Sequence, residues 1–279
     1  MRNFVILLLG FIPWQAPMMA QSWEFGGFAG TSLYFGELNT FFVPANPGLS
    51  AGVYMRRNFD GRICLRGGAS YGRVWGVDAD SKNAYERARN LSFRSDLFEG
   101  SVFIEFNFVP YRSPRNSRMD KSVCPYVMGG MSIFYFNPKA KYLDAWYELQ
   151  PLGTEGQAPG EEYKLVQPAF ILGGGLKIKL NDRGWNFNFE IGQRLLFTDY
   201  LDDVSKTYAD TRLIRGYRGF QSSIAVNLAD RSMEVDGVDR PMGEEGRQRG
   251  DSRRKDAFMI IGVGLSYNFR RHTCPANEW

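Results

Sequence analysis

Residues 257–269 constrain the fold of this chain more than any other segment. Along an extended strand, six large apolar side chains fall on one side, and small or polar side chains fall on the other. The first side carries Met259, Ile261, Val263, Leu265, Tyr267 and Phe269, and the second carries Gly262, Gly264, Ser266 and Asn268. A strand that separates lipid from the filled interior of a barrel needs two such faces. The segment therefore predicts a strand of a membrane-spanning β-barrel.

Seven further segments show the same two-residue alternation. Together with the segment above, they predict eight strands at approximately 22–36, 48–58, 62–76, 92–108, 124–136, 167–180, 185–198 and 257–269. The composition suits closely packed, lipid-facing strands, because 15% of the residues are aromatic and 31 of the 279 are glycine. Eight strands enclose only enough room for side chains, so we expect no open pore.

Charged residues recur on the face of these strands opposite to the apolar one. An Arg or Lys at the lipid midplane costs about 2–4 kcal/mol, so these side chains must point into the barrel. They are Arg62, Arg66, Glu99, Glu105, Glu190 and Arg194. Because buried charges need partners, we interpret the set as a packed ion-pair plug rather than as a path for protons or substrate.

The connections between the predicted strands alternate in length. Segments 58–61 and 181–184 are tight hairpin turns of Asn, Asp and Gly, whereas long connections lie near 37–47, 77–91, 137–166 and 199–256. Transmembrane barrels have short periplasmic turns and longer extracellular loops. The pattern predicts an all-β fold, an eight-stranded antiparallel transmembrane β-barrel with short periplasmic turns and long extracellular loops. The alternative is a soluble periplasmic barrel or sandwich.

The N-terminus has the pattern of a secretory signal. Arg2 precedes the apolar run 4–12, and small or flexible residues lead up to Gln21. We expect residues 1–20 to be the signal peptide, residues 21–270 to form the outer-membrane barrel, and residues 271–279 to form a periplasmic C-terminal tail.

The last long connection, 199–256, is too long to lack structure in a compact protein. Phe220, Ile224 and Leu228 recur at helical spacing, which predicts a short amphipathic helix. A hidden hairpin, giving ten strands in all, is the alternative.

Few residues here are suited to catalysis or to metal binding. The single histidine, His272, follows the last strand, so it cannot serve a rim Ser-His site. His272 and Cys274 lack a second ligand pair, and the acidic segment 199–205 lacks the spacing of a calcium loop. The formal net charge of +4 is too small to indicate nucleic acid. We therefore predict no enzyme activity, no cofactor, no metal site and no nucleic-acid partner.

Three cysteines and a set of basic residues mark the periplasmic side of this topology. Cys64 and Cys124 begin strands at that end, and Cys274 follows the last strand. Any two can pair, or one is left for an intermolecular disulfide, since the separation of the Cα atoms decides pairing. The basic residues are Arg112, Arg115, Arg118, Arg270 and Arg271. They form either a solvated rim or a docking surface, and with the cysteines they are the candidate contacts for a partner.

Several stretches resemble a known family. Gly264-x-x-Tyr267-x-Phe269 resembles the terminal-strand signal of bacterial outer-membrane barrels. The chain as a whole is similar to the PorG-type barrels of the type IX secretion system of Bacteroidota. The segments that carry this resemblance are 30–39, 91–95, 105–108, 136–140, 149–157, 197–205 and 248–251.

The resemblance implies a non-enzymatic outer-membrane component of a protein-export machine. Its implied partners are a periplasmic ring lipoprotein and the soluble protein that assembles with it, besides the lipid bilayer. The alternative from the residues alone is a surface barrel whose long loops bind ligands or host molecules.

Overall fold

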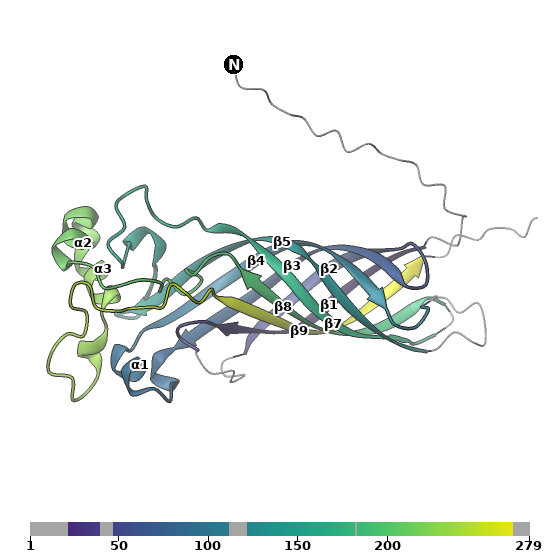
Figure 1. The fold of residues 1–279 in the computed structure, drawn as a ribbon, viewed down its shortest axis with the longest axis horizontal. Coiled ribbons are helices and arrows are strands. Elements are labelled where there is room, and N and C mark those ends of the chain that lie inside the picture. Colours follow the sequence, from purple (N-terminus) through teal and green to yellow (C-terminus); the bar gives the residue numbers. More distant parts are fainter. Residues whose placement is uncertain (1–21, 40–46, 112–121, 182, 270–279) are drawn as a thin grey trace, which may run out of the picture.

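The computed structural model describes residues 22–39, 47–111, 122–181 and 183–269. In this part of the chain, eight strands form a closed antiparallel barrel (Figure 1). They are β1 (Ser22–Phe35), β2 (Gly48–Asn58), β3 (Ile63–Val77), β4 (Ser92–Asn107), β5 (Val123–Tyr142), β7 (Val166–Lys179), β8 (Trp185–Leu196) and β9 (Ala257–Phe269). Each strand pairs with its neighbours in the order β4-β3-β2-β1-β9-β8-β7-β5, and β4 also pairs with β5. The predicted eight-stranded barrel is confirmed.

Seven of the predicted strands agree with the structure to within two residues at either end. The exception is β5, which continues six residues beyond the predicted end at 136. Alternation stops there because Phe136, Asn137 and Pro138 are all buried under the connections of that end. A Pro in a strand is also an edge signal, and β5 here leaves the barrel to pair with the short strand β6 (Ala145–Glu148).

The long connections and the helices lie together at one end of the barrel, which we call the loop end (Figure 1). The opposite end, with the short connections, is the turn end. The helices are η1 (Asp78–Asp80), α1 (Ala84–Arg89), η2 (Gln150–Leu152), α2 (Thr211–Arg218), η3 (Gly219–Gln221), α3 (Ser222–Ala229) and η4 (Ser232–Glu234). Within the described ranges, no helix is long and apolar enough to cross a bilayer.

The connection between β8 and β9 contains helices and no strand, so the ten-strand alternative is wrong. The predicted helix is present as η3 and α3. Leu228 is buried and Ile224 packs against the apolar core, but Phe220 is fully exposed. Helix α2 was not predicted from the sequence, although its start is marked: the side chain of Asp210 accepts a hydrogen bond from the Arg212 amide, as an N-cap does.

The outer surface of the barrel is apolar and bordered by aromatic rings. Mid-strand side chains such as Val102, Ile104 and Met131 are 56–60% exposed. At the turn end, aromatic rings meet edge to face, including those of Phe25 and Phe269 with centroids 5.4 Å apart. Such a band bordered by aromatics is the surface that a bilayer requires.

A second aromatic border lies nearer the loop end, and its position sets the height of the band. There the ring of Phe98 on β4 contacts those of Tyr71 and Tyr135. Phe98 and Phe106 are eight positions apart on the same strand. Strands rise about 3.4 Å per residue and tilt by about 40° in such barrels. The two borders are therefore roughly 20 Å apart along the barrel axis, close to the height of roughly 25 Å expected for a lipid-facing band.

The barrel interior has two zones. The half toward the turn end is filled by charged and amide side chains, among them Glu24, Arg56 and Glu105, all 0% exposed. The half toward the loop end is an apolar core in which the rings of Phe134 and Phe258 are 5.7 Å apart. Because α3 and the connections pack on this core, the loop end is a folded cap continuous with the barrel interior.

Candidate functional site

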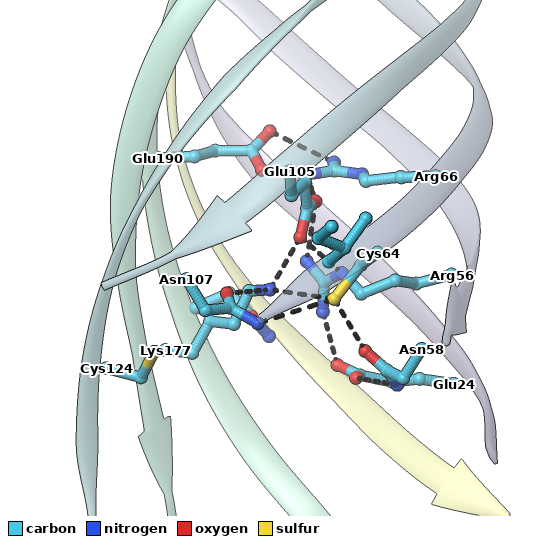
Figure 2. Close-up of polar contacts among 12 residues, drawn as sticks. Glu24, Arg56, Asn58, Cys64, Arg66, Glu105, Asn107, Cys124, Lys177 and Glu190 are labelled. Atoms are coloured by element: carbon cyan, nitrogen blue, oxygen red, sulfur yellow. Dashed lines mark hydrogen bonds and ion pairs between the residues drawn. The ribbon is translucent and has the colours of Figure 1, made fainter. Parts of the chain in front are cut away.

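A network of ion pairs fills the turn-end half of the barrel, and we call it the plug (Figure 2). Glu105 on β4 lies at its centre. Its carboxylate oxygens lie 2.8 Å from Nε of Arg56 and 2.6 Å from Nζ of Lys177. Nη1 of Arg56 also lies 2.5 Å from Oε1 of Glu24. Three strands thus hold one carboxylate between two cations.

Two further pairs extend the plug toward the middle of the barrel. Nη1 of Arg66 lies 2.5 Å from Oε2 of Glu190, and Nη2 of Arg194 lies 3.1 Å from Oε2 of Glu99. The guanidinium of Arg66 also lies 3.8 Å from the ring centroid of Tyr54. Cations on aromatic faces are stabilised without a further carboxylate.

The charges of the plug balance. Its acids are Glu24, Glu99, Glu105 and Glu190, and its cations are Arg56, Arg66, Lys177 and Arg194. An electroneutral, hydrogen-bonded set is what makes buried charges tolerable, since an unpaired buried ion costs several kcal/mol. Every one of these residues is at least nine-tenths buried. The arrangement fills the turn-end half of the barrel with paired charges.

The structure confirms five of the six residues predicted to face inward, namely Arg66, Glu99, Glu105, Glu190 and Arg194. The prediction for Arg62 is wrong. Arg62 precedes the first residue of β3 and is exposed in the turn, where its guanidinium lies 3.5 Å from the carbonyl oxygen of Phe108. Alternation does not extend into a turn, because the chain there faces water.

Three members of the plug were not predicted from the sequence, namely Glu24, Arg56 and Lys177. Each has a signal in the sequence, because it lies between outward-facing neighbours on its strand, as Glu24 does between Trp23 and Phe25. The adjacent Arg56 and Arg57 obscured this signal. Arg57 faces outward, with its guanidinium 5.1 Å from the ring centroid of Trp23, and its long side chain can reach the interface.

Cys64 and Cys124 are free, buried thiols. Sγ of Cys64 lies within the plug, 2.9 Å from Oδ1 of Asn58 (Figure 2). Sγ of Cys124 donates to the carbonyl oxygen of Val109, 3.2 Å away. Of the possible pairings, a bond between Cys64 and Cys124 is therefore not formed.

The remaining candidate contacts lie outside the described residues. These are Cys274, Arg112, Arg115, Arg118, Arg270 and Arg271. The same holds for His272 and for the signal peptide expected at 1–20.

A closed barrel with an apolar outer band and an interior filled by paired charges defines a plugged transmembrane β-barrel. Residues 1–218 match the family described as a domain of unknown function (DUF6089), and the chain belongs to this family. No curated protein matches the chain.

Solved structures with a similar fold include small surface barrels of several bacteria. One is Ail, the attachment invasion locus protein of Yersinia pestis, in complex with the heparin analogue sucrose octasulfate (TM-score 0.42, 8% identity, covering 90% of this chain and 100% of that one). Another is Neisserial surface protein A (TM-score 0.41, 8% identity, covering 88% of this chain and 97% of that one). A third is OprG of Pseudomonas aeruginosa (TM-score 0.40, 8% identity, covering 90% of this chain and 97% of that one). The strand pairing of this chain defines its fold without them.

Proposed function

We propose that this chain is a non-enzymatic outer-membrane component of the type IX protein secretion system, which anchors or positions a periplasmic ring assembly. The plug carries this proposal. Because the interior is filled by paired charges, the barrel cannot act as a conduit and must act through its ends. The similarity of the sequence to PorG-type barrels supports the secretion system as its setting.

In this proposal the turn end faces the periplasm and the loop end faces outward. Short turns on the periplasmic side are typical of transmembrane barrels. The last strand, β9, ends at the turn end, since Phe269 pairs with Trp23 near the start of β1. Residues 270–279 would then follow on the periplasmic side, next to the basic segment 112–121, with residues 1–20 removed as an export signal. The ring lipoprotein and its soluble partner would dock there.

A clean deletion of the gene tests the role in secretion. We expect the deletion strain to lose export of proteins that carry the C-terminal signal domain of this system, and the full-length chain to restore it. Export is followed by immunoblotting of the culture medium. Normal export in the deletion strain contradicts the proposal.

A surface-binding role is the second candidate, because α2 and η3 present apolar side chains to solvent. Leu213 and Tyr217 are 48% and 42% exposed, and Phe220 is fully exposed. Complementation of the deletion strain with a chain carrying L213S, Y217S and F220S shows which end of the barrel export depends on. Restored export is expected if the chain acts through its turn end, and lost export favours the loop end.

The thiols allow a test of the periplasmic contact. We expect Cys274 to form a disulfide with a periplasmic partner, because Cys64 and Cys124 are only 0% and 1% exposed. Non-reducing gels of purified membranes should show an adduct that Cys274→Ser removes. The matched controls Cys64→Ser and Cys124→Ser should retain it. An adduct that persists in the Cys274→Ser chain would count against this contact.

A further inference from the structure

Three carboxylates from separate segments meet inside the loop-end cap. Glu37 follows β1, Asp202 follows β8, and Asp256 directly precedes β9. One oxygen from each lies within 4.8 Å of the others. All three residues are buried, at 9%, 1% and 1% exposure. We call this set the cap carboxylates.

No cation of the described residues forms a salt bridge with the cap carboxylates. The two buried guanidinium groups of the cap are paired elsewhere. Arg89 binds Asp78, with Nε 2.7 Å from Oδ2, and Arg249 lies between Glu155 and Asp203. Segment 40–46, which follows Glu37, contains no Lys, Arg or His. The plug balances its charges, whereas this cluster does not.

Hydrogen bonds satisfy only part of the cluster. The Tyr34 hydroxyl has one proton to share between Oδ2 of Asp202, 2.5 Å away, and Oδ1 of Asp256, 3.3 Å away. The backbone amide of Val204 donates to Oδ1 of Asp202, and that of Leu201 donates to Oδ2 of Asp256. The backbone amide of Asp251 donates to Oε1 of Glu37.

One buried carboxylate oxygen of the cluster has no donor. Oε2 of Glu37 is buried and has no hydrogen-bond partner among the described residues. A buried acceptor left without a donor costs about 1–3 kcal/mol, and an ion bound to this oxygen removes that cost.

We propose that the cap carboxylates bind a calcium ion. Oxygens bound to one calcium at 2.3–2.6 Å are at most about 5 Å apart, which the 4.8 Å spread satisfies. The ligands come from irregular segments, and calcium tolerates irregular geometry that the stricter octahedron of magnesium does not. The ion would tie the ends of β1, β8 and β9 together. This inference does not depend on the role in secretion.

In the sequence, segment 199–205 has the acidic composition of a possible calcium loop. The structure shows why a search for a contiguous calcium loop fails here. Asp203, within that segment, instead contacts Thr154, Tyr163 and Arg249. Glu37 and Asp256 lie outside the segment, after the first strand and before the last.

Protons compete with calcium for these oxygens. Burial, and then the charges of Asp202 and Asp199, raise the pKa of Glu37 from its usual 4.5 to about 9. Burial raises the pKa of Asp202 to about 7, against the opposing effects of Tyr34, Arg89 and Arg249, and burial with Asp202 and Glu37 raises that of Asp256. Raised carboxyl pKa values mean that the folded state holds extra protons, so without calcium the stability falls as pH rises from about 4.5 to 9. Calcium affinity must rise over the same interval, because binding releases those protons.

Calcium binding by the full-length barrel in detergent tests the proposal. Equilibrium dialysis with radioactive calcium at pH 8 should show about one ion per chain, with half-saturation below about 1 mM, as in extracellular calcium modules. Binding should be at least roughly tenfold weaker at pH 6 than at pH 8, since more of the carboxylates are protonated at the lower pH. Magnesium at the same concentration should not displace the ion.

Glu37→Gln is the informative variant. Its amide oxygen can still accept from the Asp251 amide, while the charge and the unpartnered Oε2 are removed. We expect calcium binding to weaken at least roughly tenfold. The matched control is Glu234→Gln on η4, whose acid is half-exposed and paired with Arg231, and it should bind as the wild type does.

Heat-modifiable migration on gels checks that both variants are folded. No calcium binding by the folded wild-type chain at pH 8 overturns the proposal and leaves protons as the partners of the cap carboxylates. Equal binding by the wild type and a folded Glu37→Gln chain overturns it as well. If Glu37→Gln does not fold, the wild-type measurement alone decides.

Discussion

Glu105→Gln should destabilise the folded barrel by about 3–5 kcal/mol, the range found when one partner of a buried ion pair is removed. Glu105 is 0% exposed, and its carboxylate contacts Arg56, Arg66 and Lys177. Removing its charge leaves buried cations of the plug without their shared carboxylate partner. The free energy of unfolding is measured by urea titration of the barrel in lipid bilayers.

The matched control for this variant is Glu148→Gln. Glu148 also binds a lysine, with Oε1 3.0 Å from Nζ of Lys139, but both side chains are a third or more exposed. An exposed pair contributes about 0–1 kcal/mol, so the control should change stability by no more than that. A similar small change for Glu105→Gln would contradict the account of the plug.

A double variant sharpens the test, because it restores neutrality. Glu105→Gln combined with Lys177→Gln removes one charge of each sign. Residues within one ion-pair network are typically coupled by about 0.5–3 kcal/mol. The double variant should therefore be less destabilised than the sum of the two single variants.

Val102→Arg should destabilise the barrel by about 2–4 kcal/mol, the cost of an Arg at the midplane of a lipid-facing strand. Val102 is 56% exposed on β4, midway between the aromatic borders marked by Phe98 and Phe106. Its side chain faces outward, so the substitution disturbs no interior packing. The measurement is the same urea titration, in bilayers of ordinary thickness.

Leu143→Arg is the control for the lipid contact. Leu143 is 81% exposed between β5 and β6, beyond the barrel. An Arg there stays in water, and a surface substitution is expected to change stability by no more than about 0.5 kcal/mol. Equal effects of the two substitutions would mean that the outer band does not contact lipid.

The lipid makes the barrel strands easy to predict from sequence. On each strand, every second side chain contacts lipid and must be apolar. The two-residue alternation in β9 or β4 therefore identifies both the strand and its inward face. The same parity correctly places Arg66 and Glu190 inside. It does not give their pairing, because they are 124 positions apart and meet only once the register of every intervening strand is set.

The loop end follows no such rule, and there the sequence predicts less. Helix α2 and strand β6 lie beyond the lipid, where side chains obey no two-residue period. The cap carboxylates illustrate the same limit. Glu37 and Asp256 are far apart in the chain, and only the pairing of β1 with β9 brings them together. Each of them alone has the appearance of an ordinary polar loop residue.

The pairing of β1 with β9 also determines how the protein can fold. This seam joins the first strand to the last, from Trp23 with Phe269 to Phe35 with Ala257. Until β9 is in place, the sheet has two unpaired edges, which are templates for pairing with other chains. Contacts between residues so distant in sequence also form slowly. We therefore expect closure to come late in folding, and any factor that shields the edges of β1 and β9 before closure to protect the chain from aggregation.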